Sequence, residues 1–248
     1  YLRNAVHSQT ISDVPFGAFL SGGIDSSLIT SLLQTQSAEK IKTFTIGFPE
    51  YNSSDNDFDE SKHATLVAKY LGTDHTVIPL TFKEILFEVQ NISNIFSEPF
   101  ADYSQVPSHL ICKKIKSQGI TVALSGDGGD ELFGGYKRQL FARRVQLINR
   151  SIPKNISNYL LSHYKNLPKN IRITDSQITK LSNCFLAGDD KYKIYEALSS
   201  TSDKKESLFS FEVQKELNKN PVKLNFNNKL EIQEAFMMAD INNYLLSD

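Results

Sequence analysis

Residues 16–27 read Phe-Gly-Ala-Phe-Leu-Ser-Gly-Gly-Ile-Asp-Ser-Ser, an apolar run followed by a loop of glycines, hydroxyls and one acid. The apolar run predicts a strand over 16–20, and the residues after it predict a tight loop that opens a helix. Glycines let the backbone turn sharply and approach a ligand closely. Because exposed N–H groups and hydroxyls at a helix N-terminus bind anions, the loop predicts a site for a phosphate-like group.

The loop differs from a Walker A loop, because the chain contains no Gly-x-x-x-x-Gly-Lys-Ser/Thr. Without that lysine, the positive charge that a phosphate site needs must come from another group. Asp25 lies in the loop and is a ligand type that Mg²⁺ accepts. The sequence therefore predicts a metal-assisted phosphate site.

A second loop of the same character covers residues 125–136, which read Ser-Gly-Asp-Gly-Gly-Asp-Glu-Leu-Phe-Gly-Gly-Tyr. It follows the apolar, β-type run 120–124 and precedes a helical pattern. Acids within a glycine-rich loop suit Mg²⁺, which takes one or two carboxylates together with phosphate oxygens and water. The chain thus carries two candidate phosphate and metal loops.

Four apolar, β-rich runs alternate with helical patterns, at residues 16–20, 43–48, 76–80 and 121–124. Three helix signals support this reading. Gly72 follows a helical pattern as a C-terminal glycine, Thr81 and Glu84 form a capping box for a helix through about Ile95, and a further helix ends near Gly119. Such alternation predicts an α/β fold with a doubly wound parallel sheet, in which ligands bind beyond the carboxyl ends of the strands.

Length and composition narrow the class of protein. The 248 residues carry a net charge of −1, which provides no general attraction to nucleic acid or to an anionic membrane. No apolar run approaches 18 residues and no signal peptide is visible, so we expect a cytoplasmic protein. Cys112 and Cys184 lie far apart, which argues against a disulfide framework or a zinc site. A change to Lys/Asn/Ser-rich composition predicts two parts, an α/β core over 1–149 and a helical extension over 150–248.

The two loops together resemble the synthetase domain of the glutamine-hydrolysing asparagine synthetases of class B. In that family Ser-Gly-Gly-x-Asp-Ser-Ser is followed about a hundred residues later by Ser-Gly-Glu/Asp-Gly-x-Asp-Glu-x-Phe-Gly-Gly-Tyr. The first loop also resembles the pyrophosphate-binding loop (PP-loop) of the ATP pyrophosphatases. The resemblance extends to the connecting segments 12–15, 44–48, 71–75 and 98–102. It is dense over residues 1–138 and thin over 150–235.

The resemblance implies a reaction that needs ATP and Mg²⁺. The aspartate β-carboxylate attacks the α-phosphorus of ATP, pyrophosphate leaves, and ammonia from glutamine converts the β-aspartyl-adenylate to asparagine and AMP. It further implies an upstream glutaminase domain and a downstream lysine near the nucleotide, and it is compatible with a homodimer. The chain begins at Tyr1 and stops at Asp248 inside amphipathic patterns, so we expect a piece of a longer protein.

The resemblance also implies the roles of individual residues. The residues expected at the nucleotide are Leu20, Ser21, Gly22, Gly23, Asp25, Ser26, Ser27, Ile46, Ser125, Gly126 and Tyr136. Asp25 and Asp130 are expected to hold Mg²⁺. Asp127 stands where the best-known members have glutamate, a residue linked there to the ammonia step, and Lys137 lies close enough in sequence to reach the phosphates.

Several alternatives stay open at this point. Glu131 is either a ligand or a first-turn helix acid, and Tyr136 is either a ligand contact or a packing residue. Residues 102–105 are a candidate acceptor site, and the acids from Asp55 to Glu60 are interpreted as a solvated loop. At the level of function, a related amidoligase of the β-lactam synthetase type and a non-catalytic nucleotide-binding module remain alternatives. Intact Asp25 and Asp130 favour catalysis over the second.

Overall fold

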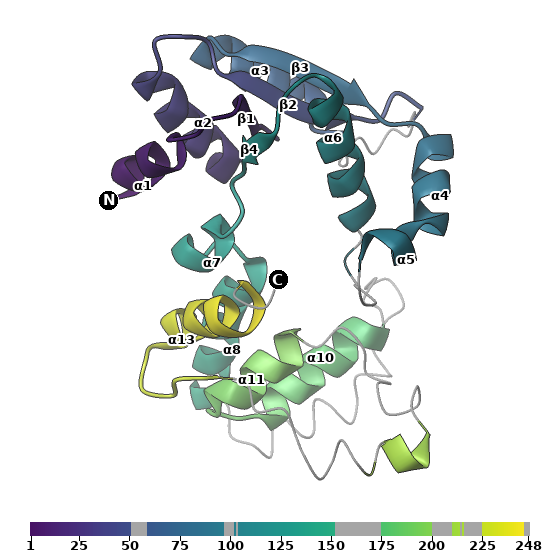
Figure 1. The fold of residues 1–248 in the computed structure, drawn as a ribbon. Helices are drawn as coiled ribbons and strands as arrows, with labels where there is room; N and C mark the ends of the chain where they lie inside the picture. Colours follow the sequence, from purple (N-terminus) through teal and green to yellow (C-terminus); the bar gives the residue numbers. More distant parts are fainter. Residues whose placement is uncertain are drawn as a thin grey trace. The chain divides into compact units, whose positions relative to one another are not determined.

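A computed structural model describes residues 1–50, 59–96, 102, 104–151, 175–199, 210–213, 215 and 225–245. The chain divides into two compact units, 1–127 and 128–248, both drawn in Figure 1. This division falls inside the second glycine loop, and a domain boundary near residue 150 stays a prediction. Within the described ranges, no helix has both the length and the apolar character that crossing a membrane requires.

The first unit is built on a four-stranded sheet whose pairs are all parallel. Its strands are β1 (Phe16–Phe19), β2 (Lys42–Gly47), β3 (Asp74–Pro79) and β4 (Val122–Leu124), in the order β3-β2-β1-β4. The chain runs outward from β1 to β3 and then returns to the other side of β1 with β4. The switch point, where open α/β sheets bind their ligands, therefore lies between β1 and β4.

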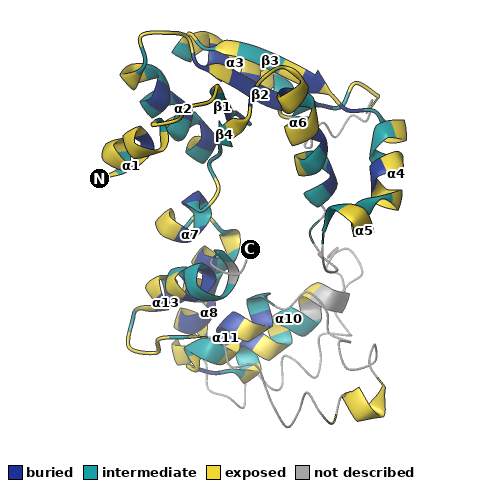
Figure 2. Cartoon of the chain, viewed as in Figure 1, coloured by how far each residue is buried: buried dark blue, intermediate teal, exposed yellow. Residues whose placement is uncertain are grey.

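Helices cover both faces of this sheet, which confirms the predicted fold class. On one face Ala18 packs with Val6 of α1 (Leu2–Gln9) and Leu33 of α2 (Ile24–Gln36), while Leu20 packs with α3 (Ser61–Leu71). Strand side chains alternate between faces, so Phe44 of β2 points the other way, into a cluster with α6 (Gln105–Ser117). In Figure 2 the buried residues of this unit follow the sheet and the helices packed on it.

The helix termination signals are confirmed, with one difference. Gly72 ends α3 in the left-handed conformation, with φ of 74°. The helix predicted through Ile95 is divided into α4 (Phe82–Gln90) and α5 (Ile92–Ile95) at Asn91. The Asn91 side chain donates to the carbonyl oxygen of Phe87 (3.0 Å), and such local side-chain bonds compete with helix continuation.

The predicted capping box at the start of α4 is present. The amide of Thr81 donates to the Glu84 carboxylate (2.9 Å), and the amide of Glu84 donates to the Thr81 hydroxyl (3.3 Å). Lys114 of α6 forms an ion pair with the same carboxylate (2.7 Å). Lys114 first, and Thr81 second, lower the pKa of Glu84 to about 2. The box therefore fixes the start of α4 and connects it to α6.

We expect Glu84→Gln to lower the free energy of unfolding by an amount that depends on pH. A carboxylate whose pKa is lowered by folding stabilises the protein above its unfolded pKa, and this contribution is lost as the pH falls through about 2. The pair is partly exposed, so the loss at pH 6 should stay below about 1 kcal/mol. Thermal unfolding at pH 6 and pH 3 measures it. The exposed acid Glu39, changed to Gln, is the control, and an equal cost of Glu84→Gln at both pH values would contradict the assignment.

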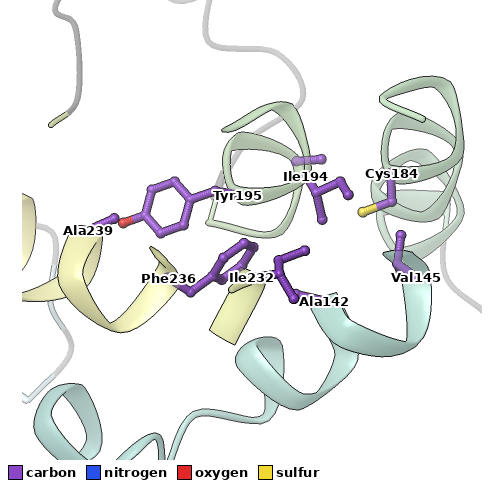
Figure 3. Packing of buried hydrophobic residues seen from close by; sticks show 9 residues of the cluster. Ala142, Val145, Cys184, Ile194, Tyr195, Ile232, Phe236 and Ala239 are labelled. Atoms are coloured by element: carbon purple, nitrogen blue, oxygen red, sulfur yellow. The ribbon is translucent and has the colours of Figure 1, made fainter. Parts of the chain in front are cut away.

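The elements with described bounds in the second unit are helices, and non-helical segments such as residues 225–231 join them. The helices are α7 (Gly129–Phe133), α8 (Lys137–Ser151), α10 (Asp175–Leu186), α11 (Lys191–Ser199), α13 (Ile232–Asp240) and the π-helix η3 (Ile241–Leu245). Figure 3 shows Phe236 of α13 beside Tyr195 of α11, with Ala142 of α8 in the same cluster. The rings of Tyr195 and Phe236 meet edge to face at 5.0 Å.

A buried carboxylate ties three of these helices together. Asp240 is 1% exposed and accepts from Arg138 (2.9 Å) and Gln139 (3.0 Å) of α8 and from the Tyr195 hydroxyl of α11 (3.0 Å). Burial, and then the charge of Asp240, raise the pKa of Tyr195 to about 12. Tyr195 therefore remains a donor throughout the physiological range, and α13 is fastened to both α8 and α11.

Candidate active site

The first glycine loop leaves β1 at its carboxyl end and is shaped by its own hydroxyls. The amide of Leu20 donates to the Phe44 carbonyl (2.9 Å), which fixes the end of the strand. The Ser21 amide donates to Oγ of Ser26 (3.2 Å), the two serine hydroxyls lie 2.9 Å apart, and the Gly23 amide donates to Oγ of Ser21 (3.2 Å). These bonds hold the loop in a defined form around the N-terminus of α2.

The N-terminus of α2 retains groups that could bind an anion. Gly23 is its N-cap and provides no side chain to satisfy the first amides, which have no partner inside a helix. The hydroxyl of Ser27 is buried and has no hydrogen-bond partner among the described residues. Asp25 lies in the first turn, half-buried. A buried donor without a partner is costly, so Ser27 is consistent with a site built for a ligand.

The start of α3 lies directly against the first glycine loop at Gly22. The φ of Gly22 is +84°, a conformation that other residues rarely adopt. A Cβ at this position would lie 2.9 Å from the backbone nitrogen of Ala64 and 3.0 Å from Cδ2 of His63. Glycine is therefore required both for the turn and for the close approach of α3.

Asp59 sets where α3 begins. Its carboxylate accepts from the amides of Ser61 (3.0 Å) and Phe48 (3.4 Å), so it joins the end of β2 to the start of the helix. Burial alone would raise the pKa of Asp59, but the hydrogen bonds from Ser61 and Phe48 outweigh it and lower the pKa. The sequence predicts a solvated loop around Asp59, whereas its carboxylate is partly buried and hydrogen-bonded. The signal that could have identified it is an acid just before a helical pattern. Asp55 and Asp57 of that loop lie outside the described residues.

The first three residues of the second loop, 125–127, follow β4 and lie next to the first glycine loop. A Cβ at Gly126 would lie 2.7 Å from the backbone nitrogen of Ser26 and 3.0 Å from Cβ of Asp25. Ser125 donates to the Asp127 carboxylate (2.8 Å) and accepts from the Asp127 amide (3.3 Å), which leaves Asp127 exposed but oriented. The loops after β1 and β4 are therefore in contact at the switch point of the sheet.

The rest of the second loop belongs to the second unit. Glu131 is 3% exposed and accepts from the Tyr136 hydroxyl at 2.5 Å. The guanidinium of Arg138 lies 3.9 Å from the centre of the Tyr136 ring. The backbone of Gly135 lies against the carboxylate of Asp130, where a Cβ would collide with it. Glu131 and Tyr136 thus both have a packing role inside this unit, and their roles toward a ligand stay predictions.

The predicted site residues are distributed over the two units. Those at the carboxyl ends of β1, β2 and β4 share the first unit: Leu20, Ser21, Gly22, Gly23, Asp25, Ser26, Ser27, Ile46, Ser125, Gly126 and Asp127. Asp130, Tyr136 and the exposed Lys137, the first residue of α8, lie in the second unit. In the described part of the chain, no cluster of three or more His, Cys, Asp or Glu side chains could hold a metal ion.

The candidate acceptor segment is described only in part. Asp102 accepts from the Ser104 amide (2.8 Å), and its carbonyl accepts from the Gln105 side chain (2.8 Å). These bonds shape the start of α6. The neighbouring residues 97–101 and 103 lie outside the described residues, so an acceptor site here stays a prediction.

The chain was compared with known proteins. A family model described as asparagine synthase matches residues 1–246. A Methanocaldococcus jannaschii protein, whose provisional name is asparagine synthetase 2 (glutamine-hydrolysing), is 40% identical over 156 residues, 62% of this chain and 28% of the relative. Asparagine synthetase 1 (glutamine-hydrolysing) of Bacillus subtilis is 35% identical over 171 residues, 69% of this chain and 26% of the relative. Asparagine synthetase B (glutamine-hydrolysing) of Escherichia coli is 35% identical over 152 residues, 54% of this chain and 26% of the relative.

The chain spans about a quarter of the length of the curated relatives it matches. The family model, in contrast, covers the chain almost from end to end. On this match, the chain belongs to the asparagine synthase family.

Proposed function

We propose that the chain is the ATP-dependent synthetase part of a glutamine-hydrolysing asparagine synthetase. It would join the β-carboxylate of aspartate to AMP, release pyrophosphate, and pass the activated carboxylate to ammonia to form asparagine. The relatives named above carry this activity in their names. A separate glutaminase domain would supply the ammonia in the whole protein, for which we propose a cytoplasmic location.

The observation that carries the proposal is the contact between the two glycine loops. Gly126 lies so close to the Ser26 amide that a side chain at position 126 would collide with the backbone of the first turn of α2. A loop that serves only as a connection needs no such approach. An anion held at the α2 N-terminus would be bordered by both loops, at the place where α/β sheets bind their ligands.

The chemistry requires stabilisation of the leaving pyrophosphate. Charge develops on this group when the bond to the α-phosphorus breaks, and fixed donors that face developing charge lower the barrier most. We propose that the α2 amides, Ser21, Ser26 and Ser27 provide these donors. The backbone at Leu20, Ile46 and Gly126 would hold the adenosine.

Mg²⁺ fits the residues present, because it takes few protein carboxylates and completes its shell with phosphate oxygens and water. Asp25 is half-buried in the first turn of α2, and no hydrogen bond or ion pair engages its carboxylate within the described ranges. We propose Asp25 and Asp130 as the carboxylates that would hold the ion. When bound, Mg²⁺ would neutralise charge on the phosphates.

Three further roles complete the proposal. Asp127, held by Ser125 and exposed, would accept a proton from ammonia in the second step. Lys137 would contribute positive charge toward the phosphates, and Tyr136 would contact the nucleotide. The roles of Asp127 and Tyr136 rest on the resemblance of the second loop, and that of Lys137 on its place directly after this loop in the sequence.

Aspartate-dependent release of pyrophosphate from Mg-ATP, with ammonium chloride present, tests the function. The protein should be extended to the natural ends of its gene product, and the products identified by mass. Equal amounts of asparagine and AMP are expected. If pyrophosphate is released only with another carboxylic acid, aspartate is not the substrate, and the result favours an amidoligase of the β-lactam synthetase type. Binding of ATP with no release under any condition would contradict catalysis and favour a nucleotide-binding module.

We expect Ser27→Ala to weaken ligand binding without destabilising the fold. Its hydroxyl is buried and unpartnered among the described residues, so removing it should leave the free energy of unfolding unchanged or raise it by about 1 kcal/mol. Loss of a hydrogen bond to a charged ligand should raise the dissociation constant for pyrophosphate about tenfold. Calorimetric binding and urea unfolding give both quantities. Ser26→Ala is the comparison, because it breaks bonds within the loop and should lower stability as well. A destabilised Ser27→Ala with unchanged pyrophosphate affinity would contradict the role.

A further inference from the structure

A second helix borders the first glycine loop and contributes a side chain that the resemblance does not assign. The α3 helix approaches Gly22 so closely that a Cβ there would lie 2.9 Å from the Ala64 nitrogen. The start of α3 is fixed by Asp59, which accepts from the Ser61 amide (3.0 Å). The first turn of α3 is therefore held in place beside the loop.

His63 is the side chain of that first turn that reaches the loop. Its Cδ2 atom lies 3.0 Å from the position of a Cβ on Gly22. In an imidazole ring Cδ2 is bonded to Nε2, so this nitrogen is one bond away from the ring atom that lies beside the loop. His63 is an exposed residue, so a ligand can reach its ring.

The hydrogen bonding of His63 differs from that of two other histidines in the same unit. His75 is anchored by Thr43, whose hydroxyl lies 2.9 Å from Nδ1, and His109 lies 3.7 Å from the buried Glu88 carboxylate. No hydrogen bond or ion pair engages the His63 ring among the residues that the structure describes. The ring nitrogens of His63 thus stay available to a ligand at the loop.

We propose that His63 is a further phosphate-binding residue, whose imidazole N–H donates to the pyrophosphate moiety of ATP at the first glycine loop. This inference rests on the proposed function. The loop has no lysine of the Walker type, and a neutral or protonated imidazole provides an N–H donor in either state. An imidazole beside Gly22 would extend the row of donors formed by the loop and the α2 amides. It would act on the phosphates that leave, and it would make no contact with the adenosine.

Binding of two probes, inorganic pyrophosphate and AMP, tests the inference in the presence of Mg²⁺. We expect His63→Ala to raise the dissociation constant for pyrophosphate about tenfold and to change that for AMP less than twofold. His63→Gln keeps an N–H donor and should recover most of the pyrophosphate affinity. Lys69→Ala, which removes a positive charge from the last turn of the same helix, should leave both constants unchanged.

The outcomes separate the inference from the proposed function. Unchanged pyrophosphate affinity in His63→Ala would overturn the inference while leaving the function intact. An equal loss for both probes, with no recovery in His63→Gln, would show a packing role and would also overturn it. If the unchanged protein binds AMP but no pyrophosphate, both the inference and the proposed site fail. Circular dichroism of each variant confirms that the fold is retained.

Discussion

Gly22→Ala is expected to reduce ATP–pyrophosphate exchange at least about 100-fold. A residue other than glycine at φ +84° costs about 1–2 kcal/mol. The added Cβ would in addition lie 2.9 Å from the backbone nitrogen of Ala64, so either the loop or α3 must move. A displacement of about 1 Å in a positioning group can lower a rate about 100-fold. Exchange kinetics, with urea unfolding on the same samples, measure the two effects.

Gly119→Ala is a closely matched control for this experiment. Gly119 has φ of +83° in the same unit, but a Cβ there would meet no atom within 4 Å. The variant therefore carries the same backbone strain without the collision. We expect it to lose about 1–2 kcal/mol of stability and to keep its exchange rate within about twofold. Equal exchange rates in the two variants would show that the contact with α3 is irrelevant to the site.

The second large effect is expected in the other unit, where Asp240→Ala should remove about 3–5 kcal/mol of stability. The substitution leaves the Arg138 guanidinium, whose side chain is 29% exposed, without its buried carboxylate and deprives Tyr195 and Gln139 of an acceptor. Breaking a buried ion pair from one side leaves an uncompensated charge, which is the origin of the large cost. Urea denaturation followed by circular dichroism gives the free energy of unfolding.

Asp189→Ala provides the matched comparison within the same unit. Asp189 also pairs with an arginine, Arg150 (3.0 Å), but both side chains are more than half exposed. Exposed pairs contribute about 0–1 kcal/mol, because water solvates each charge when the other is removed. A cost for Asp240→Ala that is no larger than for Asp189→Ala would mean that the hydrogen bonds and the ion pair of Asp240 have no stabilising role.

The local signals in the sequence predicted the elements of the first unit well. The capping box of Thr81 and Glu84 and the terminating Gly72 act over a few residues, so their effect can be read directly from neighbouring positions. The strand and helix alternation predicted a parallel sheet, which the strand pairs confirm. The division of a predicted helix at Asn91 was missed, because the bond from its side chain to Phe87 is a weak local preference that a pattern of apolar residues does not reveal.

The sequence by itself determined the fold class and the two glycine loops, because strand, turn and helix preferences depend on adjacent residues. Only the tertiary structure decided which groups surround those loops. Three contacts join residues from different parts of the chain: the hydrogen bond from the Phe48 amide to Asp59, the approach of His63 to Gly22, and the contact of Gly126 with Ser26. Asp240 likewise binds residues that are distant in sequence: Tyr195 precedes it by 45 positions and Gln139 by 101 positions. Such contacts form only when packing brings distant segments together. The residues next to a charged or polar residue in the sequence do not indicate which distant residue it will bind.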